Sequence, residues 1–293
     1  MLCIGYVAAI KAGQKGLKTA CVEKRGALGG TCLNVGCIPS KALLNATHKY
    51  HEAKHDFKNF GISTGPITID FSQMQKQKDN TVVGLTSGIE YLFKKYGVDY
   101  YKGWGKFSSN TGVQIDMNEG GTKDIIAKHS IIATGSEPTS LPAGLLDIDE
   151  KYVVSSTGAL ALDKIPKKMI VVGGGVIGLE MGSVYQRLGT DVQVVNNSDR
   201  ICPFLDAEVS KQFLRILKKQ GLNFHLSTSL VSGVNNKEKG VSVTVKGPKG
   251  ESTLDADVVL LSIGRRPYTG GLQLEKAGLA TDKFGRIEIN KTW

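Results

Sequence analysis

The chain has 293 residues, of which 41% are hydrophobic, so it is long enough for two domains and has the composition of a folded protein. Its net charge of +10 is scattered in short basic pairs, and no apolar stretch reaches the roughly 18 residues that a membrane span needs. These features favour a soluble globular protein and exclude nucleic acid and membrane as expected partners.

Near the amino terminus, residues 6–16 have the apolar spacing of a helix, and residues 17–24 predict a strand that ends at an acidic residue. Together they predict the second half of a βαβ unit. Its first strand and glycine turn should precede Gly5, and we expect them to be lacking. Glu23, at the end of the strand, is expected to hold the adenosine ribose of a dinucleotide.

Two helices are expected next, one from Ser40 to residue 54 with Pro39 near its start, and one over residues 70–97. Residues 129–136 predict a buried strand that runs into a turn. The proline-containing segment 136–150 then predicts the junction between two domains.

A second α/β unit begins at Lys168, where a strand, a glycine turn, a helix and another strand follow in order. Gly173, Gly175 and Gly178 form G-x-G-x-x-G directly after the strand. The first glycine permits a tight turn, the second lets a pyrophosphate approach the backbone, and the helix N-terminus offers N–H groups to the anion. A further helix over residues 207–221 and strands over 241–247 and 252–264 are expected after it.

About 20 residues after such a turn, an acidic side chain normally binds the dinucleotide ribose, and here Asn196 occupies that place. An amide can accept from a hydroxyl but lacks the charge of a carboxylate, so weaker binding is expected. Arg200 could contact a 2′-phosphate, but a single arginine is more typical of surface, which favours NAD slightly over NADP.

The cysteines fall into two groups. Cys3, Cys21 and Cys202 have no close partner in sequence, and we expect them to be small buried apolar residues. Cys32 and Cys37 lie five positions apart, but a zinc site there would need two further ligands that are not suitably spaced. Histidines 48, 51 and 55 share one helix face among charged neighbours, so no metal site is expected.

The segment GGTCLNVGCIPSKALL, residues 29–44, resembles the redox-active disulfide segment of the flavin disulfide reductases, and within them the dihydrolipoamide dehydrogenases. The likeness continues through ATGSEP, KMIVVGGGVIGLEMGSVYQRLG and IGRRP. The resemblance implies an α/β fold with two Rossmann-like dinucleotide-binding domains. An FAD domain would span 1–140 without its first strand and glycine turn, an inserted NAD domain 141–270, and a return into the FAD domain 271–293.

The resemblance also implies roles for individual residues. Cys32 matches the thiol that exchanges with substrate, and Cys37 the thiol that lies against the flavin, where a helix start favours the thiolate. Lys41 and Glu180 match a pair beside the flavin ring, in which the lysine tunes the flavin and the glutamate balances its charge. The remaining cofactor-binding positions implied are Gly30, Thr31, Ala133, Thr134, Gly135, Ser136, Gly264 and Arg265.

The implied activity is oxidation of dihydrolipoamide with reduction of NAD⁺, through the cysteine pair and FAD. The implied partners are the lipoyl domains of 2-oxo acid dehydrogenase complexes and a second copy of the chain. The implied compartment is the mitochondrial matrix or the bacterial cytoplasm.

Two alternatives stay open. The family's dimer-interface domain, with its catalytic histidine, would follow Trp293, so the chain is also expected to be an inactive truncated product that retains at most NAD binding. A glutathione-reductase-like, NADPH-dependent disulfide reductase is the weaker alternative, because no basic cluster accompanies Asn196.

Overall fold

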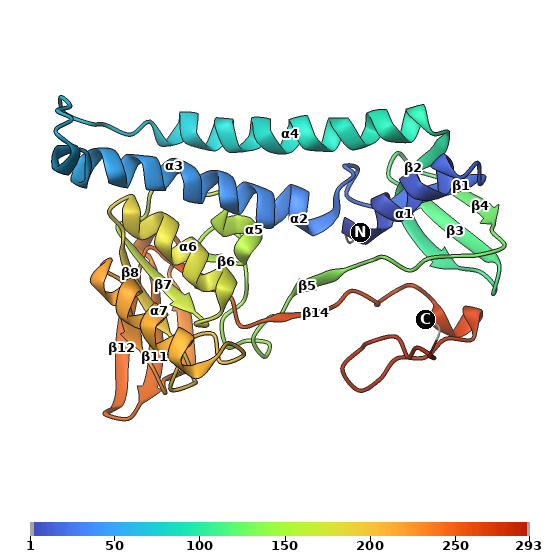
Figure 1. Ribbon diagram of the computed structural model, residues 1–293. Coiled ribbons are helices and arrows are strands. Elements are labelled where there is room, and N and C mark those ends of the chain that lie inside the picture. The colour runs from blue at the N-terminus through green and yellow to red at the C-terminus, as the bar shows by residue number, and fades with distance from the viewer. Residues whose placement is uncertain (1–2, 292–293) are drawn as a thin grey trace. The chain divides into compact units, whose positions relative to one another are not determined.

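The computed structural model describes residues 3–291, which divide into two compact units (Figure 1). The first unit consists of the chain up to Ile38, Asn80–Glu137, and the chain from Arg265 onward. The second consists of Pro39–Asp79 and Pro138–Gly264. Helices α3 (Cys37–His55) and α4 (Phe71–Lys95) contribute residues to both units. The domain boundaries expected at residues 140 and 270 stay a prediction.

The first unit is built on a four-stranded sheet in the order β1-β2-β3-β4. Strands β1 and β2 are parallel, and β2, β3 and β4 form an antiparallel meander. The sequence-predicted helix and strand at the amino end are confirmed as α1 and β1. The elements of this unit are α1 (Cys3–Gln14), β1 (Thr19–Glu23), α2 (Gly30–Val35), β2 (Val98–Phe107), β3 (Gly112–Met117), β4 (Thr122–Ile126) and the 3₁₀ helix η3 (Leu274–Ala277).

Cys21 lies in the core of the first unit, where α1 and the carboxyl end of α4 pack against β1 and β2. Its side chain is 5% exposed, and Cys202 of the second unit is 1% exposed. Both were expected to be buried apolar residues, and that prediction is confirmed. The side chain of Cys3 lies outside the described residues.

The buried strand predicted over residues 129–136 is wrong. Residues 127–135 are irregular, and Ile131 is 72% exposed. A strand needs a neighbouring strand to accept and donate its backbone hydrogen bonds, and none of the described strands pairs with this segment. Only its end is extended, as β5 (Ser136–Pro138), which pairs with β14 (Arg265–Pro267).

Helix α3 begins at Cys37, three residues earlier than the sequence predicted. Pro39 therefore lies inside the first turn of the helix. A proline is tolerated there because the first four N–H groups of a helix have no acceptor within the helix. The long helix predicted over residues 70–97 is confirmed as α4.

The second unit contains a five-stranded parallel sheet in the order β6-β13-β7-β8-β9, which confirms the α/β fold predicted here. A three-stranded antiparallel sheet, β10-β11-β12, completes the unit. Its strands are β6 (Val153–Val154), β7 (Lys168–Val172), β8 (Asp191–Val195), β9 (Asn223–His225), β10 (Ser229–Asn235), β11 (Val241–Gly247), β12 (Gly250–Ala256) and β13 (Val258–Leu261). Its remaining helices are η1 (Phe57–Phe60), α5 (Ser156–Ala159), α6 (Val176–Arg187), α7 (Ala207–Lys219) and η2 (Lys237–Lys239).

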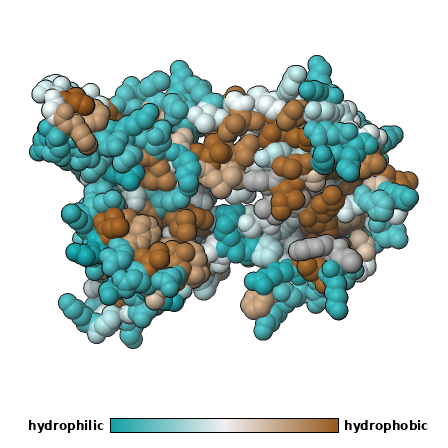
Figure 2. Space-filling model, in the orientation of Figure 1, coloured by the Kyte–Doolittle hydropathy of each residue, from teal (hydrophilic) through white to brown (hydrophobic). Residues whose placement is uncertain are grey.

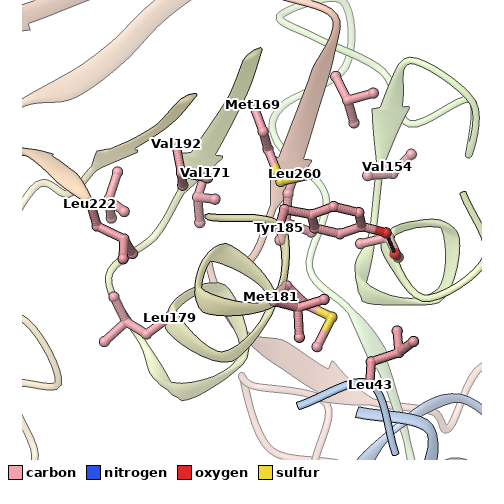
Figure 3. Packing of buried hydrophobic residues seen from close by; sticks show 14 of the residues in the cluster. Leu43, Val154, Met169, Val171, Leu179, Met181, Tyr185, Val192, Leu222 and Leu260 are labelled. Carbon is pink, nitrogen blue, oxygen red and sulfur yellow. Dashed lines mark hydrogen bonds between the residues drawn. The ribbon is translucent and has the colours of Figure 1, made fainter. Parts of the chain in front are cut away.

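Alternate residues of each strand of the parallel sheet point to opposite faces, and both faces are buried under apolar side chains. On β7, Met169 and Val171 face α6, where Tyr185 is fully buried (Figure 3). Ile170 and Val172 face the other way and pack with the three-stranded sheet. The sheet is thus held rigidly between two apolar layers, and it positions the glycine turn that follows β7.

Several large apolar side chains remain exposed, among them Phe60, Ile126 and Phe204. Brown, hydrophobic side chains interrupt the teal surface in Figure 2. None of the helices formed by residues 3–291 combines the length and the apolarity that crossing a membrane would require.

Candidate functional site

The two closely spaced cysteines lie on either side of a bend at Gly36, between α2 and α3. Gly36 separates the helices, and a Cβ atom built on it would lie 2.8 Å from the Thr31 carbonyl oxygen, so any side chain there would collide. Cys32 is half-buried within α2, and Cys37 is exposed as the first residue of α3. The turn explains why a glycine must stand between the two thiols.

The approach to α2 is shaped by two glycines with positive φ, 109° at Gly29 and 65° at Gly30. A side chain on Gly29 would press against Leu33, whose Cβ lies 2.8 Å from the position that its Cβ would take. The Asn34 amide stabilises this turn by donating to the carbonyl oxygens of Leu28 and Gly30. The backbone around Gly30 and Thr31, predicted to bind a cofactor, is therefore held in a conformation that other residues adopt poorly.

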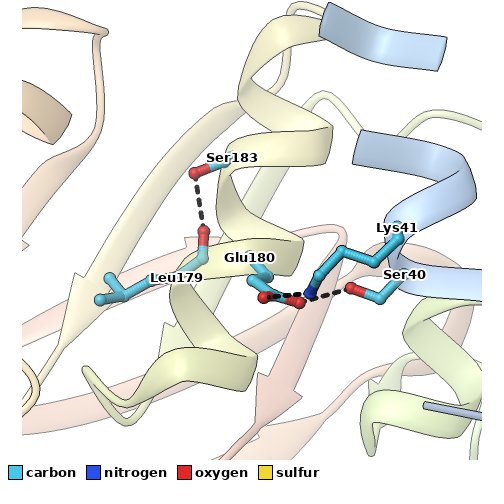
Figure 4. Close-up of polar contacts among 5 residues, drawn as sticks. All are labelled: Ser40, Lys41, Leu179, Glu180 and Ser183. Carbon is cyan, nitrogen blue, oxygen red and sulfur yellow. Dashed lines mark hydrogen bonds and ion pairs between the residues drawn. The ribbon is translucent and has the colours of Figure 1, made fainter. Parts of the chain in front are cut away.

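Lys41 and Glu180, predicted to form a pair, are brought together in the second unit. Lys41 Nζ lies 2.6 Å from Glu180 Oε1, and the Ser40 hydroxyl donates to Glu180 Oε2 at 2.6 Å (Figure 4). Ser40 is buried, whereas the Lys41 side chain is 60% exposed. Sequence reasoning missed Ser40, although its position next to Lys41 in the segment CIPSK could have indicated it.

The glycine turn between β7 and α6 has the geometry that its sequence predicted. Gly173 has a φ of 113°, and a Cβ atom on it would lie 2.5 Å from the Ser262 carbonyl oxygen. A Cβ on Gly178 would collide with the Gly173 carbonyl oxygen and with Ser262 Oγ. A Cβ on Gly175 would meet nothing within 4 Å, and Gly175 precedes α6 without a side-chain cap.

These three glycines therefore have separate tasks. Gly173 and Gly178 are required by close packing against Ser262, the residue after β13, while the position of Gly175 is open. An open backbone at an uncapped helix N-terminus suits a pyrophosphate. Ser262, whose hydroxyl donates to the carbonyl oxygens of Val172 and Gly173, is a further residue that the sequence did not single out.

Asn196 lies at the carboxyl end of β8, directly beside the glycine turn. Its side chain is 8% exposed, and its Oδ1 accepts from the Gly174 N–H at 2.9 Å. Its predicted contact with a ribose stays a prediction, but its contact with the turn is a feature that the sequence did not indicate.

In the first unit, the predicted FAD-binding positions lie on two segments. Glu23 is buried at the end of β1, where Oε1 accepts from the Arg25 N–H at 2.9 Å. Residues 133–136 are half-buried and irregular up to β5, and the Gly135 carbonyl accepts from the Tyr268 N–H at 2.9 Å.

Arg265 holds β14 to β5. Its Nε donates to Ser136 Oγ at 2.8 Å, and its Nη2 donates to the Ser136 carbonyl at 2.6 Å. Burial, with a smaller contribution from Arg25, lowers the pKa of the Arg265 guanidinium from its usual value. Gly264, just before it, has a φ of 133°. In the second unit, its carbonyl accepts from the Thr139 N–H.

The model of the family described as pyridine nucleotide-disulphide oxidoreductase matches residues 5–293, which include the cysteine pair and the glycine turn after β7. The chain belongs to this family. Members are enzymes of the oxidoreductase class that use FAD and NAD(H).

Within residues 3–291, no group of histidine, cysteine, aspartate or glutamate side chains is arranged to hold a metal ion.

Curated relatives are similar over nearly all of the chain. A mitochondrial dihydrolipoyl dehydrogenase of Pisum sativum is 56% identical, over 98% of this chain and 57% of the relative. A leghemoglobin reductase of Vigna unguiculata is also 56% identical, over 98% of this chain and 55% of the relative. The chain thus spans little more than half the length of the curated relatives that it matches.

Solved structures share the fold. LpdA of Mycobacterium tuberculosis superimposes with a TM-score of 0.86 at 24% identity, covering 97% of this chain and 61% of that one. A HOCl-induced flavoprotein disulfide reductase of Escherichia coli superimposes with a TM-score of 0.82 at 24% identity, covering 99% of this chain and 61% of that one. At this identity, the likeness confirms the predicted fold class and carries no further conclusion.

Proposed function

We propose that the chain carries the dithiol and the dinucleotide-binding regions of a dihydrolipoyl dehydrogenase, which oxidises dihydrolipoamide to lipoamide and reduces NAD⁺. The observation that carries the proposal is the ion pair of Lys41 with Glu180. Lys41 lies one turn after Cys37 on α3, and Glu180 lies on α6, the helix that starts at the glycine turn. Identities between 53% and 57% to dihydrolipoyl dehydrogenases support the same assignment.

The proposed chemistry of the cysteines is thiol–disulfide exchange. In the oxidised protein, one thiolate of dihydrolipoamide attacks Sγ of Cys32, the bond between Cys32 and Cys37 breaks, and Cys37 leaves as a thiolate. The second thiolate of the substrate then attacks the mixed disulfide, releases Cys32 and closes the disulfide of lipoamide. The substrate loses two electrons and two protons; reduction of NAD⁺ to NADH takes up both electrons and one proton, and the other proton goes to solvent.

The residues of the first unit fit FAD. A buried carboxylate at the carboxyl end of a parallel strand, here Glu23, is where this kind of fold binds an adenosine ribose. The left-handed turn at Gly29 and Gly30 leaves backbone bare of side chains before Thr31, and residues 133–136 offer half-buried backbone groups. When bound, FAD supplies a two-electron acceptor between the dithiol and NAD⁺.

The residues of the second unit fit NAD. Gly173 and Gly178 shape the turn, Gly175 leaves room for a pyrophosphate, and the N–H groups of the first turn of α6 would donate to it. Lys41, which the resemblance places beside the flavin and not at the NAD site, has its ammonium group held by Glu180.

The proposal extends to partners and compartment. We infer that the physiological dithiol is the lipoyl group of 2-oxo acid dehydrogenase complexes, that two copies of the native protein form a dimer, and that it works in the mitochondrial matrix. The names of several relatives, which specify mitochondrial enzymes, support the last inference.

The exchange reaction of the cysteines tests the proposal without requiring complete turnover. The purified chain would be oxidised, incubated with dihydrolipoamide, alkylated and digested, and the state of each cysteine would be read by mass spectrometry. We expect a peptide linked through Cys32 and Cys37 before the incubation and two alkylated thiols afterwards. Flavin released from the purified protein by heat would be identified by chromatography as FAD.

A Cys202→Ser variant serves as the matched control, because Cys202 is buried and takes no part in the proposed exchange. It should behave as the unchanged chain does, whereas Cys32→Ser should abolish the linked peptide. A protein in which Cys32 and Cys37 never become linked under mild oxidation would contradict the proposal.

A further inference from the structure

Both the oxygen and the nitrogen of the Asn196 side-chain amide form hydrogen bonds with nearby backbone groups. Oδ1 accepts from the Gly174 N–H at 2.9 Å, and Nδ2 donates to the carbonyl oxygens of Ser198 at 3.2 Å and Arg200 at 3.0 Å. Both amide hydrogens are thus used, and these partners also decide which atom of the amide is oxygen. The side chain is 8% exposed, so it presents little surface to a ligand.

Gly174 is held from two directions by this arrangement. Its N–H donates to Asn196, and its carbonyl accepts from the Cys202 N–H at 2.9 Å. A Cβ atom on Gly174 would lie 3.0 Å from Cγ of Asn196, so the amide packs directly against the turn. Asn196 therefore links the glycine turn to the loop that follows β8.

An amide at position 196 also carries no charge, whereas a site that prefers NAD to NADP usually has a carboxylate at this position. A carboxylate there accepts a hydrogen bond from the ribose 2′-hydroxyl, and it repels a 2′-phosphate. Asn196 has no charge, its Oδ1 already accepts from the Gly174 N–H, and both of its donors are committed. In residues 196–205, Asp199 and Arg200 are the only charged side chains, so the loop as a whole is neutral.

Arg200 does not give the site a preference for NADP over NAD. Its Nη2 donates to the Pro203 carbonyl at 2.8 Å, which ties the guanidinium to its own loop. It is the only basic side chain of this loop, whereas tight phosphate recognition usually uses a bidentate or clustered arrangement.

We propose that Asn196 is a positioning residue of the glycine turn and not a ribose ligand, so that the site accepts dinucleotides with and without a 2′-phosphate. The inference rests on the proposed function, because it concerns the same dinucleotide site. Selection between NAD and NADP is then nearly absent, in contrast to a site that carries a carboxylate at this position.

Calorimetric titration of the whole chain with NAD⁺ and, separately, with NADP⁺ tests the proposal, since neither oxidised form reacts with the oxidised protein. We expect the two dissociation constants to agree within about threefold, because no charged group at position 196 separates the two ligands. Asn196→Glu should restore selection and favour NAD⁺ by at least about tenfold.

Asn197→Glu is the matched control, because it places the same charge on the adjacent exposed side chain. It should leave the ratio of the two constants unchanged. Asn196→Ala should weaken both ligands by a similar factor, since the turn loses its support while no ribose contact is lost.

The outcomes separate the two proposals. An unchanged chain that prefers NAD⁺ by tenfold or more would overturn the role given to Asn196 and leave the proposed function standing. A chain that binds neither dinucleotide would overturn both. The ratio for the unchanged chain decides the matter even if Asn196→Glu fails to fold.

Discussion

Lys41 and Glu180 stand 139 residues apart in the chain, yet Nζ of the lysine lies 2.6 Å from Oε1 of the glutamate. The buried Ser40 hydroxyl donates to the other carboxylate oxygen. The lysine end of the pair is open to water, so the ion pair itself adds little stability. The pair instead fixes the position of α3 relative to α6, because one carboxylate on α6 holds two consecutive residues of α3.

Replacing Lys41 and replacing Glu180 should therefore lower the free energy of unfolding by different amounts. Lys41→Met should lower the free energy of unfolding by less than about 0.5 kcal/mol, as for other exposed ion pairs. Glu180→Ala should cost about 1–2 kcal/mol, because the buried Ser40 hydroxyl loses its acceptor. Urea unfolding followed by circular dichroism measures both, and Glu180→Gln, which keeps an acceptor, is the control. Equal costs for Lys41→Met and Glu180→Ala would refute this account.

The glycine turn after β7 offers a matched pair of alanine substitutions. Gly178→Ala should destabilise the protein by about 1–3 kcal/mol, because its Cβ would collide with Gly173 and Ser262. Gly175→Ala should change stability by less than about 0.5 kcal/mol, since its Cβ meets no atom. It should nevertheless weaken NAD⁺ binding at least about tenfold by blocking the pyrophosphate.

Thermal unfolding and calorimetric titration measure these two effects on the same protein samples. If Gly175→Ala bound NAD⁺ as tightly as the unchanged chain, the turn would not be the pyrophosphate site.

The thiols should differ strongly in reactivity. Burial, followed by the charge of Glu23, raises the pKa of Cys21 to about 12, and burial also raises the pKa of Cys202. Only a thiolate attacks a disulfide reagent, so at about pH 8 these two cysteines should react only after unfolding. Cys37 is exposed and should react first in the reduced, native protein.

Titration with a chromogenic disulfide in a Cys3→Ser background would measure these rates. Cys37→Ser should remove the fastest phase, while Cys21→Ser should leave every native phase unchanged. Rapid loss of the Cys21 thiol in the folded chain would contradict the expectation.

Stability should fall in alkaline solution. Cys21 has a folded pKa of about 12, raised from 9.0, and burial also raises the pKa of Tyr100 and Tyr185. Above about pH 9 the unfolded thiol loses its proton while the folded thiol keeps it, so rising pH favours unfolding. One such group contributes a slope of at most about 1.4 kcal/mol per pH unit between these two pKa values.

Urea midpoints measured at a series of pH values would show this decline. Cys21→Ala should lower stability at neutral pH, because it leaves a small cavity, but it should flatten the alkaline slope. Parallel slopes for the two proteins would rule out Cys21 as a source of the decline.

Local sequence patterns determined most of the elements around the proposed site. The alternating and helical periodicities predicted α1, β1, α4 and the β7–α6–β8 unit, because these segments follow backbone geometry that a few neighbouring residues specify. The spacing of Gly173, Gly175 and Gly178 likewise predicted the turn, since its shape depends on steric freedom within six residues.

Other features were decided only by tertiary structure. The apolar run at residues 129–136 reads as a strand, but it forms none up to residue 135, because strand formation depends on a neighbouring strand that no local pattern can supply. The position of Asn196 in the sequence predicts a weakened ribose ligand. Its side chain packs on Gly174 and bonds to two carbonyl groups, and that geometry exists only after the loop has folded back on β8. The residue types therefore specified which chemistry was available, and long-range packing specified which atoms remained free to perform it.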